Sequence, residues 1–465
     1  MEPSKQLKKL EPTENEIQKT LSTIARITSG FYSSLDKGPV FSPSPKWDGI
    51  SLDSTQELGT VLNDLVNRLQ NSGLQTASGG HLAYIPGGGL FIGAIADYIA
   101  AITNHFTGDR SASPIGVAIH DEVISWCKKQ LGLNKHYWGD VTSGGTQATI
   151  RAMLAARQHH KIKPKDFHKT VLYCTEHSHH CFNRAANLVF AGECQIRLIK
   201  TADYKLSAHH LEATIKSDIK KGLNPFFAMA TAGTTNLGIV DDLASIATVK
   251  SRYDLWFHVD GAFGGAFAML DSHKHIFLGL EKADSIILDP HKSMFLPYGC
   301  GIVLIAHPSL ANLAATDGDT SYLQDRNQAM ELSPMDYSLE VTRPFRALRI
   351  WLALKVYGFE TLAVVLNTKL EDTDWIYHEL TKINKIRVLT KPELTIIGFR
   401  VDDDPSDEKT KALLTSINGR GNVYLSSTNI DSRFVIRIAI LSHRTKKFHL
   451  QRLLEDIKLG LKDSE

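Results

Sequence analysis

The chain has no long hydrophobic run, little net charge and few cysteines, and each shortage excludes a class of protein. Its 52 basic and 50 acidic side chains nearly cancel, for a formal charge of +2, so no global field would attract nucleic acid or a membrane surface. The most apolar helical stretch, LFIGAIADYIAAI, carries Asp97 in its middle, which argues against a membrane-spanning segment. We therefore expect a small-molecule partner, with no nucleic acid and no membrane.

Cysteine usage and the N-terminus both bear on the compartment. The five cysteines form no CxxC pair and are odd in number, which is typical of reduced thiols rather than a disulfide framework. The first residues, MEPSKQLKKLEPTENE, lack the apolar core that a secretory signal needs. These features predict a cytoplasmic protein.

Three regions differ in their patterns and predict an N-terminal segment (1–118), a large domain (119–355) and a small α+β domain (356–465). In the large region, short apolar runs alternate with helix-length amphipathic segments. The runs are TVLYC, QIRLI, FFAMATAG, WFHVDGA, SIILD and CGIVLIA. This alternation predicts a mainly parallel sheet covered by helices, with ligands beyond the carboxyl ends of the strands.

A turn of small residues, TSGGTQAT at 142–149, leads into a predicted helix. Gly144 and Gly145 let backbone amides approach an anion, Thr146 adds a hydroxyl, and the helix N-terminus supplies partial positive charge. A phosphate group suits this turn. The same residues also fit an ordinary glycine turn in which Thr146 caps the helix.

Two charged residues follow neighbouring apolar runs. Asp260 ends the run in WFHVDGAFGG, and Lys292 follows ADSIILDPH; one strand, helix and strand between them would place both at one edge of the sheet. Asp260 could hydrogen-bond a cationic ring nitrogen, although a loop cap or a metal ligand would use the same carboxylate. Apolar walls and a neighbouring cation would lower the pKa of Lys292, so that its neutral amine could form a Schiff base with an aldehyde.

Pyridoxal phosphate carries the three groups that these features would bind: an aldehyde, a ring nitrogen and a phosphate. Each feature alone has an ordinary explanation. Together, in this order along a parallel sheet, they predict a site for pyridoxal 5'-phosphate.

Four stretches carry a family resemblance: TSGGTQATIRAMLAAR, TAGTTNLGIVDDL, WFHVDGAFGGA and DSIILDPHKS. They resemble the group II pyridoxal-phosphate-dependent decarboxylases, which include aromatic amino acid, glutamate, histidine and cysteine sulfinate enzymes. The resemblance implies the α/β fold of fold-type-I, aspartate-aminotransferase-like transferases, with a mainly parallel seven-stranded sheet between helices, an N-terminal extension and a small α+β C-terminal domain. It also implies a homodimer with active sites at the interface.

The resemblance assigns cofactor roles to residues of these motifs. Lys292 matches the lysine that holds the cofactor, and His291 matches its neighbour on the phosphate side. Asp260 matches the partner of the ring nitrogen. The remaining matches are the small residue against the ring, Ala262, and the phosphate cup, Gly145 and Thr146.

Further matches lie in HSHHCFNRAANLVFAG and GTTNLGIVDDL. His179 aligns with a histidine that stacks on the cofactor ring, Cys181 with a serine of the family and Arg184 with a lysine. Thr235 and Asp241 match positions around the cofactor and the stacked histidine.

A metal site built from His177, His179 and His180 is an alternative, because imidazoles are common ligands. We expect no metal, since neighbouring residues 179 and 180 would point to opposite sides of a strand and the resemblance explains His179 without one.

The implied reaction is decarboxylation of an L-amino acid to a primary amine and CO2, through an external aldimine and a quinonoid. A positioned acid must then protonate the α-carbon. Tyr322, in the polar segment TDGDTSYLQDRNQAM, matches a family tyrosine on a mobile loop; a neutral surface tyrosine is the alternative. A carbon–carbon lyase of the sphingosine-phosphate-lyase type or an aldehyde synthase remains possible on the same scaffold, although Tyr322 argues against the synthase. A binding protein without a cofactor is disfavoured.

Two segments leave the substrate open. HLAYIPGGGL resembles a substrate-entrance element and predicts substrate contacts at Tyr84, Ile85 and Pro86, with Ile85 where an aromatic residue is usual. SPIGVAIHDE departs from the family at Val117, Ala118 and His120. Side-chain selectivity depends on a few pocket contacts, and neither an acidic nor an aromatic amino acid is excluded.

Overall fold

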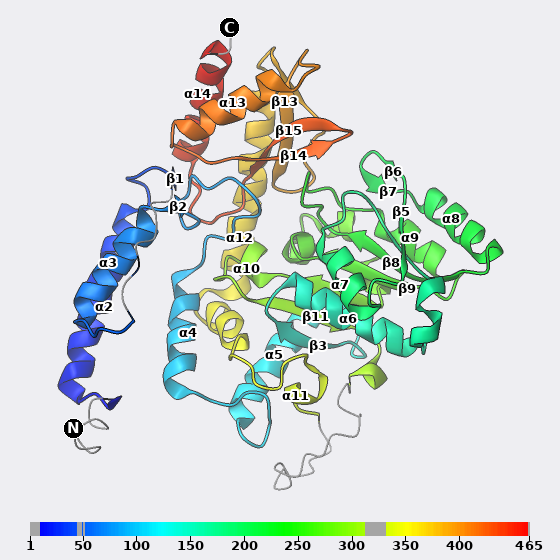
Figure 1. The fold of residues 1–465 in the computed structure, drawn as a ribbon, viewed down its shortest axis with the longest axis horizontal. Helices are drawn as coiled ribbons and strands as arrows, with labels where there is room; N and C mark the ends of the chain where they lie inside the picture. The colour runs from blue at the N-terminus through cyan, green and yellow to red at the C-terminus, as the bar shows by residue number, and fades with distance from the viewer. Residues whose placement is uncertain (1–9, 44–48, 50–51, 312–331, 464–465) are drawn as a thin grey trace.

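Two sheets of different kinds organise the molecule (Figure 1). The computed structural model describes residues 10–43, 49, 52–311 and 332–463. A seven-stranded sheet forms the large body and a four-stranded sheet forms a smaller C-terminal layer above it. The boundaries near residues 118 and 355 stay a prediction.

The large sheet is parallel except for one strand. Its order is β3-β11-β10-β9-β8-β4-β5, and β11 runs antiparallel to both of its neighbours. The predicted mainly parallel seven-stranded sheet is confirmed. Its strands are β3 (Trp138–Thr142), β4 (Thr170–Cys174), β5 (Gln195–Leu198), β8 (Asn224–Thr231), β9 (Trp256–Gly261), β10 (Ser285–Leu288) and β11 (Gly301–Ile305).

Helices cover both faces of this sheet, which is why its strands read as continuous apolar runs. One face packs against α5, α8 and α9, and the other packs against α6 and α7. Their bounds are α5 (Pro114–Gln130), α6 (Gly145–His159), α7 (Cys181–Val189), α8 (Ala208–Lys220) and α9 (Leu243–Lys250). A small hairpin of β6 (Thr201–Ala202) and β7 (Lys205–Leu206) precedes α8.

The N-terminal part contains two helices at the surface of the molecule. α2 (Glu14–Ser34) and α3 (Leu58–Gln70) contain no buried residue. They contact each other and run side by side along one flank of the molecule (Figure 1). The two-stranded β1 (Phe41–Ser42) and β2 (Gly73–Leu74) link them to the C-terminal layer, and α4 (Phe91–Thr103) follows.

The C-terminal layer is an antiparallel sheet in the order β12-β13-β15-β14 with helices packed on it. Its elements are β12 (Ile386–Val388), β13 (Ile396–Val401), α13 (Glu408–Gly419), β14 (Ser426–Ile430), β15 (Arg433–Ala439) and α14 (Lys447–Asp463). The α+β character expected for this region is present.

The long helix α12 (Ala347–Thr381) joins the two sheets and bends at Gly358, which has φ 71° and ψ 160°. By length and composition α12 is apolar enough to cross a membrane. In this fold it instead packs against α4, α5 and the small sheet. The short helices α10 (Pro290–Ser293) and α11 (Pro334–Tyr337) complete the α-helices among the described residues.

Candidate active site

A cavity of about 390 Å³ lies where the predicted residues converge. It opens beyond the carboxyl ends of β9 and β10, beside the N-terminus of α6 and the turn before α7. β9 and β10 are adjacent and parallel, with Ile287 opposite Asp260, so both strands deliver their following residues to the same edge. The predicted residues that line it are Gly145, Thr146, His179, Cys181, Thr235, Asp260, Ala262, His291 and Lys292.

Lys292 sits in α10, the single helical turn that follows β10. Its Nζ lies 3.0 Å from Oδ2 of Asp289. Burial lowers the pKa of Lys292, but the carboxylates of Asp289 and Asp260 outweigh it and raise that pKa above its usual value. The expectation of a lowered pKa was therefore wrong for the chain itself, because the neighbouring charges are anions rather than a cation.

Asp260 is the last residue but one of β9 and is 5% exposed. Burial raises the pKa of its carboxyl group, while the nearby Lys292 acts in the opposite direction. The backbone N–H of Ala262 donates to Oδ1 at 3.1 Å and fixes the orientation of the carboxylate. Asp260 is thus a buried acid with one oxygen bonded to the backbone, and it lines the same cavity as Lys292.

The N-terminus of α6 forms another wall. Gly144 caps it with φ 151°, a conformation that favours glycine. A β-carbon at position 145 would lie 3.1 Å from Oδ2 of Asp289 and 3.5 Å from Cβ of Ala262, so Gly145 lies against both residues. Together with Thr146, these residues leave the first amides of the helix open to an anion.

His291 turns its ring toward this helix end. Its Nδ1–H donates to the carbonyl of Cys300 at 2.6 Å, which fixes the ring and leaves Nε2 3.8 Å from Oδ2 of Asp289.

His179 lies in a turn before α7, not in a strand. The rings of His179 and His180 lie 4.1 Å apart, so the expectation that they point to opposite sides of a strand was wrong. Burial, with help from Lys292, lowers the pKa of His179 to about 4, which keeps the ring neutral. The backbone N–H of Cys181 donates to its Nδ1 at 3.2 Å.

Two aligned residues lie outside the cavity lining. Arg184 is exposed on α7. Asp241 is buried and accepts the backbone N–H groups of Leu206 at 2.6 Å and Thr231 at 2.7 Å; burial raises its pKa to about 6. Because Thr231 lines the cavity, Asp241 supports the wall rather than forming it.

The predicted entrance residues also lie outside the lining set. Tyr84 is 58 % exposed and adopts φ 55°, while Pro86 is buried and Ile85 partly so. Their link to the cavity runs through the next residue, since a β-carbon on Gly87 would lie 2.0 Å from the carbonyl oxygen of His291. Tyr322 lies outside the described residues.

The structure shows two further residues, at or near the cavity, that were not predicted from the sequence. Asp289 lines the cavity, and its position three residues before Lys292 in DPHK was the available signal, since such residues are neighbours on a helical turn. Arg437 is 3 % exposed on β15 and donates only to neutral acceptors among the described residues, including the carbonyls of Tyr84 and Thr235. No local pattern marked Arg437, because its partners come from distant segments.

Of the departures noted in α5, His120 belongs to a separate buried network. Nε2 of His120 lies 3.4 Å from Oδ1 of Asp140, and Arg343 Nη1 donates to the same oxygen at 2.6 Å. Burial would raise the pKa of Asp140, but Arg343 and His120 hold it well below its usual range. His120 therefore stabilises β3 beneath the cavity.

The residues of the cavity suit pyridoxal phosphate. The volume falls within the range of small-ligand sites, and an amine, a buried acid and an open helix N-terminus match the aldehyde, ring nitrogen and phosphate. Oδ1 of Asp289 is buried without a hydrogen-bond partner among the described residues, as expected where a ligand completes the polar contacts.

Comparison with known proteins decides the family. The profile of the pyridoxal-dependent decarboxylase conserved domain matches residues 50–402. The chain belongs to this family. An aromatic-L-amino-acid decarboxylase from Bacillus atrophaeus is 31% identical over 386 residues, which is 81% of this chain and 80% of the relative.

Solved structures show the same fold across the whole chain. Tryptophan decarboxylase from Catharanthus roseus, in complex with L-tryptophan, superposes with a TM-score of 0.90 at 22% identity and covers 98% of this chain and 99% of its own. The 4-hydroxyphenylacetaldehyde synthase from Rhodiola rosea superposes with a TM-score of 0.87 at 22% identity, covering 97% of this chain and 99% of its own. The decarboxylase therefore has the fold-type-I architecture and uses pyridoxal phosphate to release CO2 from an amino acid.

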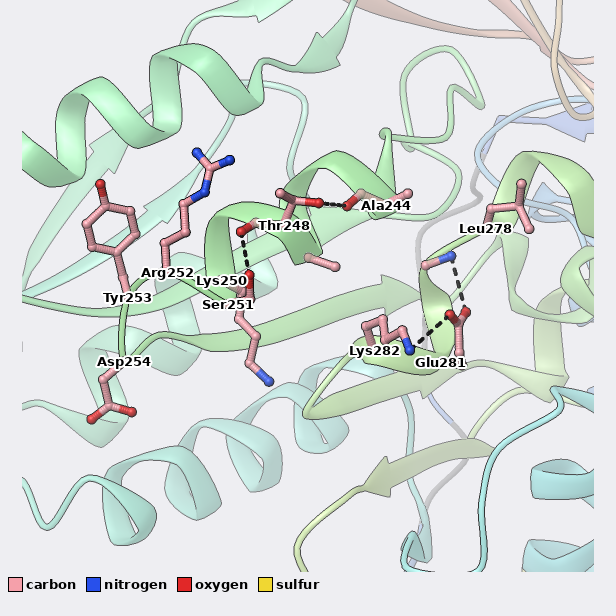
Figure 2. Close-up of a pocket in the computed structure, with 12 residues that line it drawn as sticks. Ala244, Thr248, Lys250, Ser251, Arg252, Tyr253, Asp254, Leu278, Glu281 and Lys282 are labelled. Atoms are coloured by element: carbon pink, nitrogen blue, oxygen red, sulfur yellow. Dashed lines mark hydrogen bonds and ion pairs between the residues drawn. The ribbon is translucent and has the colours of Figure 1, made fainter.

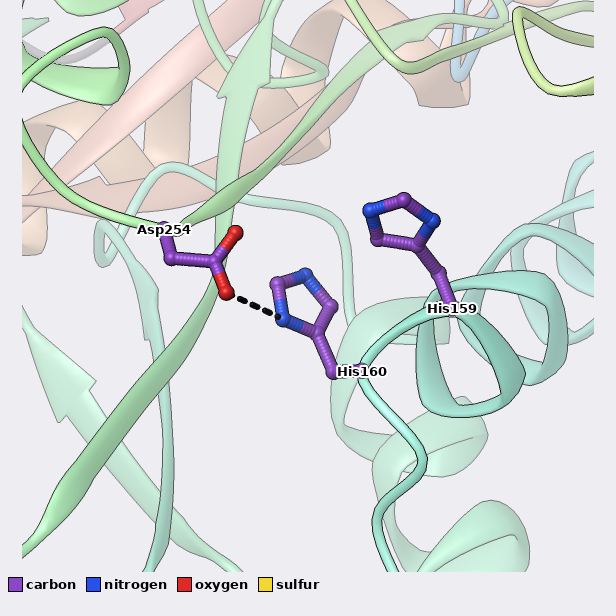
Figure 3. A group of neighbouring side chains, drawn as sticks. All are labelled: His159, His160 and Asp254. Carbon is purple, nitrogen blue, oxygen red and sulfur yellow. Dashed lines mark ion pairs between the residues drawn. The ribbon is translucent and has the colours of Figure 1, made fainter.

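Two other features of the enzyme lie outside this cavity. A larger surface hollow of about 870 Å³ lies beside α9 (Figure 2), but each of its charged side chains has an ion-pair partner, as Lys250 has in Asp284 and Arg252 in Glu212. His159, His160 and Asp254 approach one another at the far end of α6 (Figure 3), with His160 Nδ1 3.4 Å from Asp254 Oδ2. Asp254 is 93% exposed. The larger volume therefore does not mark the active site. The convergence of buried titratable groups identifies the cavity at Lys292 as the candidate active site.

Proposed function

We propose that the protein decarboxylates an aromatic L-amino acid to the corresponding arylalkylamine. The observation that carries this proposal is the convergence of Lys292, Asp260, His179 and the α6 N-terminus in one cavity, in a chain that shares 31% identity with an aromatic-L-amino-acid decarboxylase. Phe263 adds a buried aromatic wall to the same cavity, against which an aryl side chain could pack.

The residues divide the work of binding and activation. When bound, pyridoxal phosphate supplies an electron sink beside the α-carbon of the substrate. Asp260 would hold the ring nitrogen protonated, since a buried carboxylate favours a neighbouring cation. The amine of Lys292 would engage the cofactor's aldehyde, the neutral ring of His179 would pack on the cofactor face, and Gly145, Thr146 and His291 would surround the phosphate. Ala262 and Thr235 complete the walls.

A product screen tests the substrate class. Purified enzyme with cofactor should release CO2 and amine from L-tryptophan, L-tyrosine or L-3,4-dihydroxyphenylalanine, with kcat/KM at least tenfold above that for L-glutamate or cysteine sulfinate. The reason is that the described lining of the cavity contains Phe263 and, apart from Lys292, no lysine or arginine that could pair with a second carboxylate. Lys292→Ala should abolish both the visible absorption of the bound cofactor and amine release. Preference for an acidic substrate would overturn the aromatic assignment while leaving the cofactor chemistry in place.

Aldehyde formation is the second candidate, because the Rhodiola rosea synthase is 24% identical over 86% of this chain. The two activities differ in products: an aldehyde synthase consumes oxygen and yields aldehyde in place of amine. We expect amine with no oxygen uptake, read by an oxygen electrode alongside amine chromatography.

Tyr322 remains our proposed acid for the α-carbon, on the family resemblance alone. Tyr322→Phe should keep cofactor absorbance and lose amine production. An unchanged amine yield would remove Tyr322 from the mechanism.

We also propose a homodimer with active sites at its interface, in the cytoplasm. Exposed apolar side chains on α3 and α4 support a partner surface, since monomers rarely expose such patches. Mixed dimers of Lys292→Ala and Tyr322→Phe chains should regain activity if each site takes Lys292 from one chain and Tyr322 from the other; no regain would place both in one chain.

All five cysteines are free, which supports a reducing compartment.

A further inference from the structure

Asp289 is a buried acid that the assigned roles leave unused. Its side chain is 3% exposed, Oδ2 accepts from Lys292 Nζ at 3.0 Å, and Oδ1 has no hydrogen-bond partner among the described residues. A buried carboxylate oxygen without a partner is costly unless something else completes it. Asp289 also lines the cavity, so a ligand that enters the cavity comes next to this carboxyl group.

The side chain lies at the place where an anion would bind. A β-carbon on Gly145 would lie 3.1 Å from Oδ2 and 3.6 Å from Oδ1 of Asp289, and Gly145 is the first residue of α6. The open amides of that helix end attract a phosphate. A phosphate held there would therefore share the helix N-terminus with the carboxyl group of Asp289.

Few charges are available to separate these two anions. The titratable groups that interact with Asp289 come from α10, β9, the turn before α7, α7 and the residue before β11. They are Lys292, His291, Asp260, His179, Cys181 and Cys300. His179 is neutral, since its pKa is lowered to about 4 by burial, and both thiols have pKa values raised to about 12 by burial. Lys292 is the one lysine or arginine among them, and its amine cannot both pair with Asp289 and engage the cofactor's aldehyde.

We propose that Asp289 makes cofactor binding proton-coupled: the carboxyl group of Asp289 and the phosphate of pyridoxal phosphate share one proton in the complex. The free phosphate is mostly dianionic above pH 7, because its second ionisation falls at about pH 6. Binding above that pH therefore takes up about one proton from solvent, and affinity falls as pH rises. This inference does not depend on which amino acid is decarboxylated.

Equilibrium titrations of the cofactor-free enzyme with pyridoxal phosphate between pH 7 and 9 test this coupling. They should be followed by cofactor absorbance and protein fluorescence in buffers without primary amines. The wild-type dissociation constant should rise with pH, and Asp289→Asn, which places a neutral amide beside the phosphate, should flatten the profile. The ratio of wild-type to Asp289→Asn dissociation constants should grow about tenfold per pH unit, the slope of one proton. Parallel profiles would overturn the proposal.

Two control variants make the result specific. Asp284 lies directly before β10 and Asp289 directly after it. Asp284 pairs with Lys250 and His307, away from the cavity. Asp284→Asn therefore removes the same charge and should keep the wild-type dependence of the dissociation constant on pH. Thr146→Ala should weaken binding by a similar factor at every pH. If Thr146→Ala has no effect, the phosphate does not lie at α6 and the assigned site is wrong, which is a failure distinct from parallel profiles.

Phosphorus NMR of the holoenzyme supplies a readout that a purely structural role would not move. At pH 8 the bound phosphate should resonate toward the position of the free monoanion, and Asp289→Asn should shift it toward that of the dianion. His291→Gln should leave the wild-type shift in place. A dianion shift in wild type, or loss of the monoanion shift in His291→Gln, would show that Asp289 does not share the proton.

Discussion

Gly87 occupies a position that admits no side chain. A β-carbon there would lie 2.0 Å from the carbonyl oxygen of His291 and 3.1 Å from that of Lys292. Both contacts are with backbone, which cannot rotate away. The glycine thus lets the 84–89 segment lie directly on the turn that carries the reactive lysine.

We predict that Gly87→Ala displaces this turn and lowers kcat/KM by at least a hundredfold, because small displacements at a reacting centre cost that much. Gly419→Ala, with no atom within 4 Å of the added β-carbon, is the matched control and should retain activity. The measurement is steady-state amine formation together with cofactor absorbance. Wild-type kinetics in Gly87→Ala would show that the turn does not need this contact.

At this scale the sequence identified the site because its motifs are local. Lys292, Asp260, Gly145 and Thr146 each lie at or next to the end of an element, so their convergence follows from the rule for parallel sheets. The contacts of Arg437 and Gly87 were not predictable, since both join segments hundreds of residues apart. The pKa direction of Lys292 was also missed, because it depends on where the side chain of Asp289 points.

Among the elements, β9 contains a buried titratable group near its centre. His258 is 0% exposed, and burial lowers its pKa to about 3. In the unfolded chain a histidine titrates near 6.5. Between these values the unfolded state binds more protons than the folded state, so the free energy of unfolding falls as the pH falls below 6.5.

We predict that His258→Phe removes part of this acid sensitivity. One histidine contributes roughly 1.4 kcal/mol per pH unit within that window and nothing above it, so the variant should lose less stability between pH 6.5 and 5. Urea unfolding midpoints at the two pH values provide the measurement. His136→Phe, at an exposed position, should behave as wild type; identical pH profiles for all three proteins would contradict the prediction.

The bend in α12 depends on Gly358. Its φ of 71° and ψ of 160° fall in a region that is essentially restricted to glycine. Gly358→Ala should lower the free energy of unfolding by about 1–3 kcal/mol, measured by urea unfolding. Gly30→Ala, in α2 with nothing within 4 Å, should be neutral or slightly stabilising.

Element prediction succeeded where strands are apolar on both faces. Six of the sheet's strands matched quoted apolar runs, whereas β3, WGDVT, was missed because Gly139 and Asp140 interrupt it. Packing requires a glycine at position 139, because a β-carbon there would lie 2.7 Å from the Leu304 side chain. β14, SSTNI, is a polar edge strand and carries no hydrophobic signal.

For the whole molecule, the surface of the N-terminal helices predicts self-association. Leu58, Leu65 and Leu69 of α3 are exposed and recur at helical spacing, which places them in one stripe. Leu69→Glu should convert a dimer to monomer or raise its dissociation constant at least tenfold, because it places a charge in an apolar interface.

Light scattering coupled to gel filtration measures the mass. Asn63→Glu, an exposed polar position on the same helix, should leave the dimer intact. A Leu69→Glu protein that is as dimeric as wild type would exclude this stripe from the interface.

The antiparallel strand β11 sets the order in which the molecule can assemble. β3 pairs with no strand of the large sheet except β11, although β3 is the first of the seven to leave the ribosome and β11 is the last. The strand that precedes Gly145 therefore has no pairing partner in this sheet until residues 301–305 have been made. Long-range pairing of this kind slows folding and prolongs the exposure of apolar strands. Nascent chains that end before residue 301 should consequently be unable to capture the cofactor, however complete their catalytic motifs.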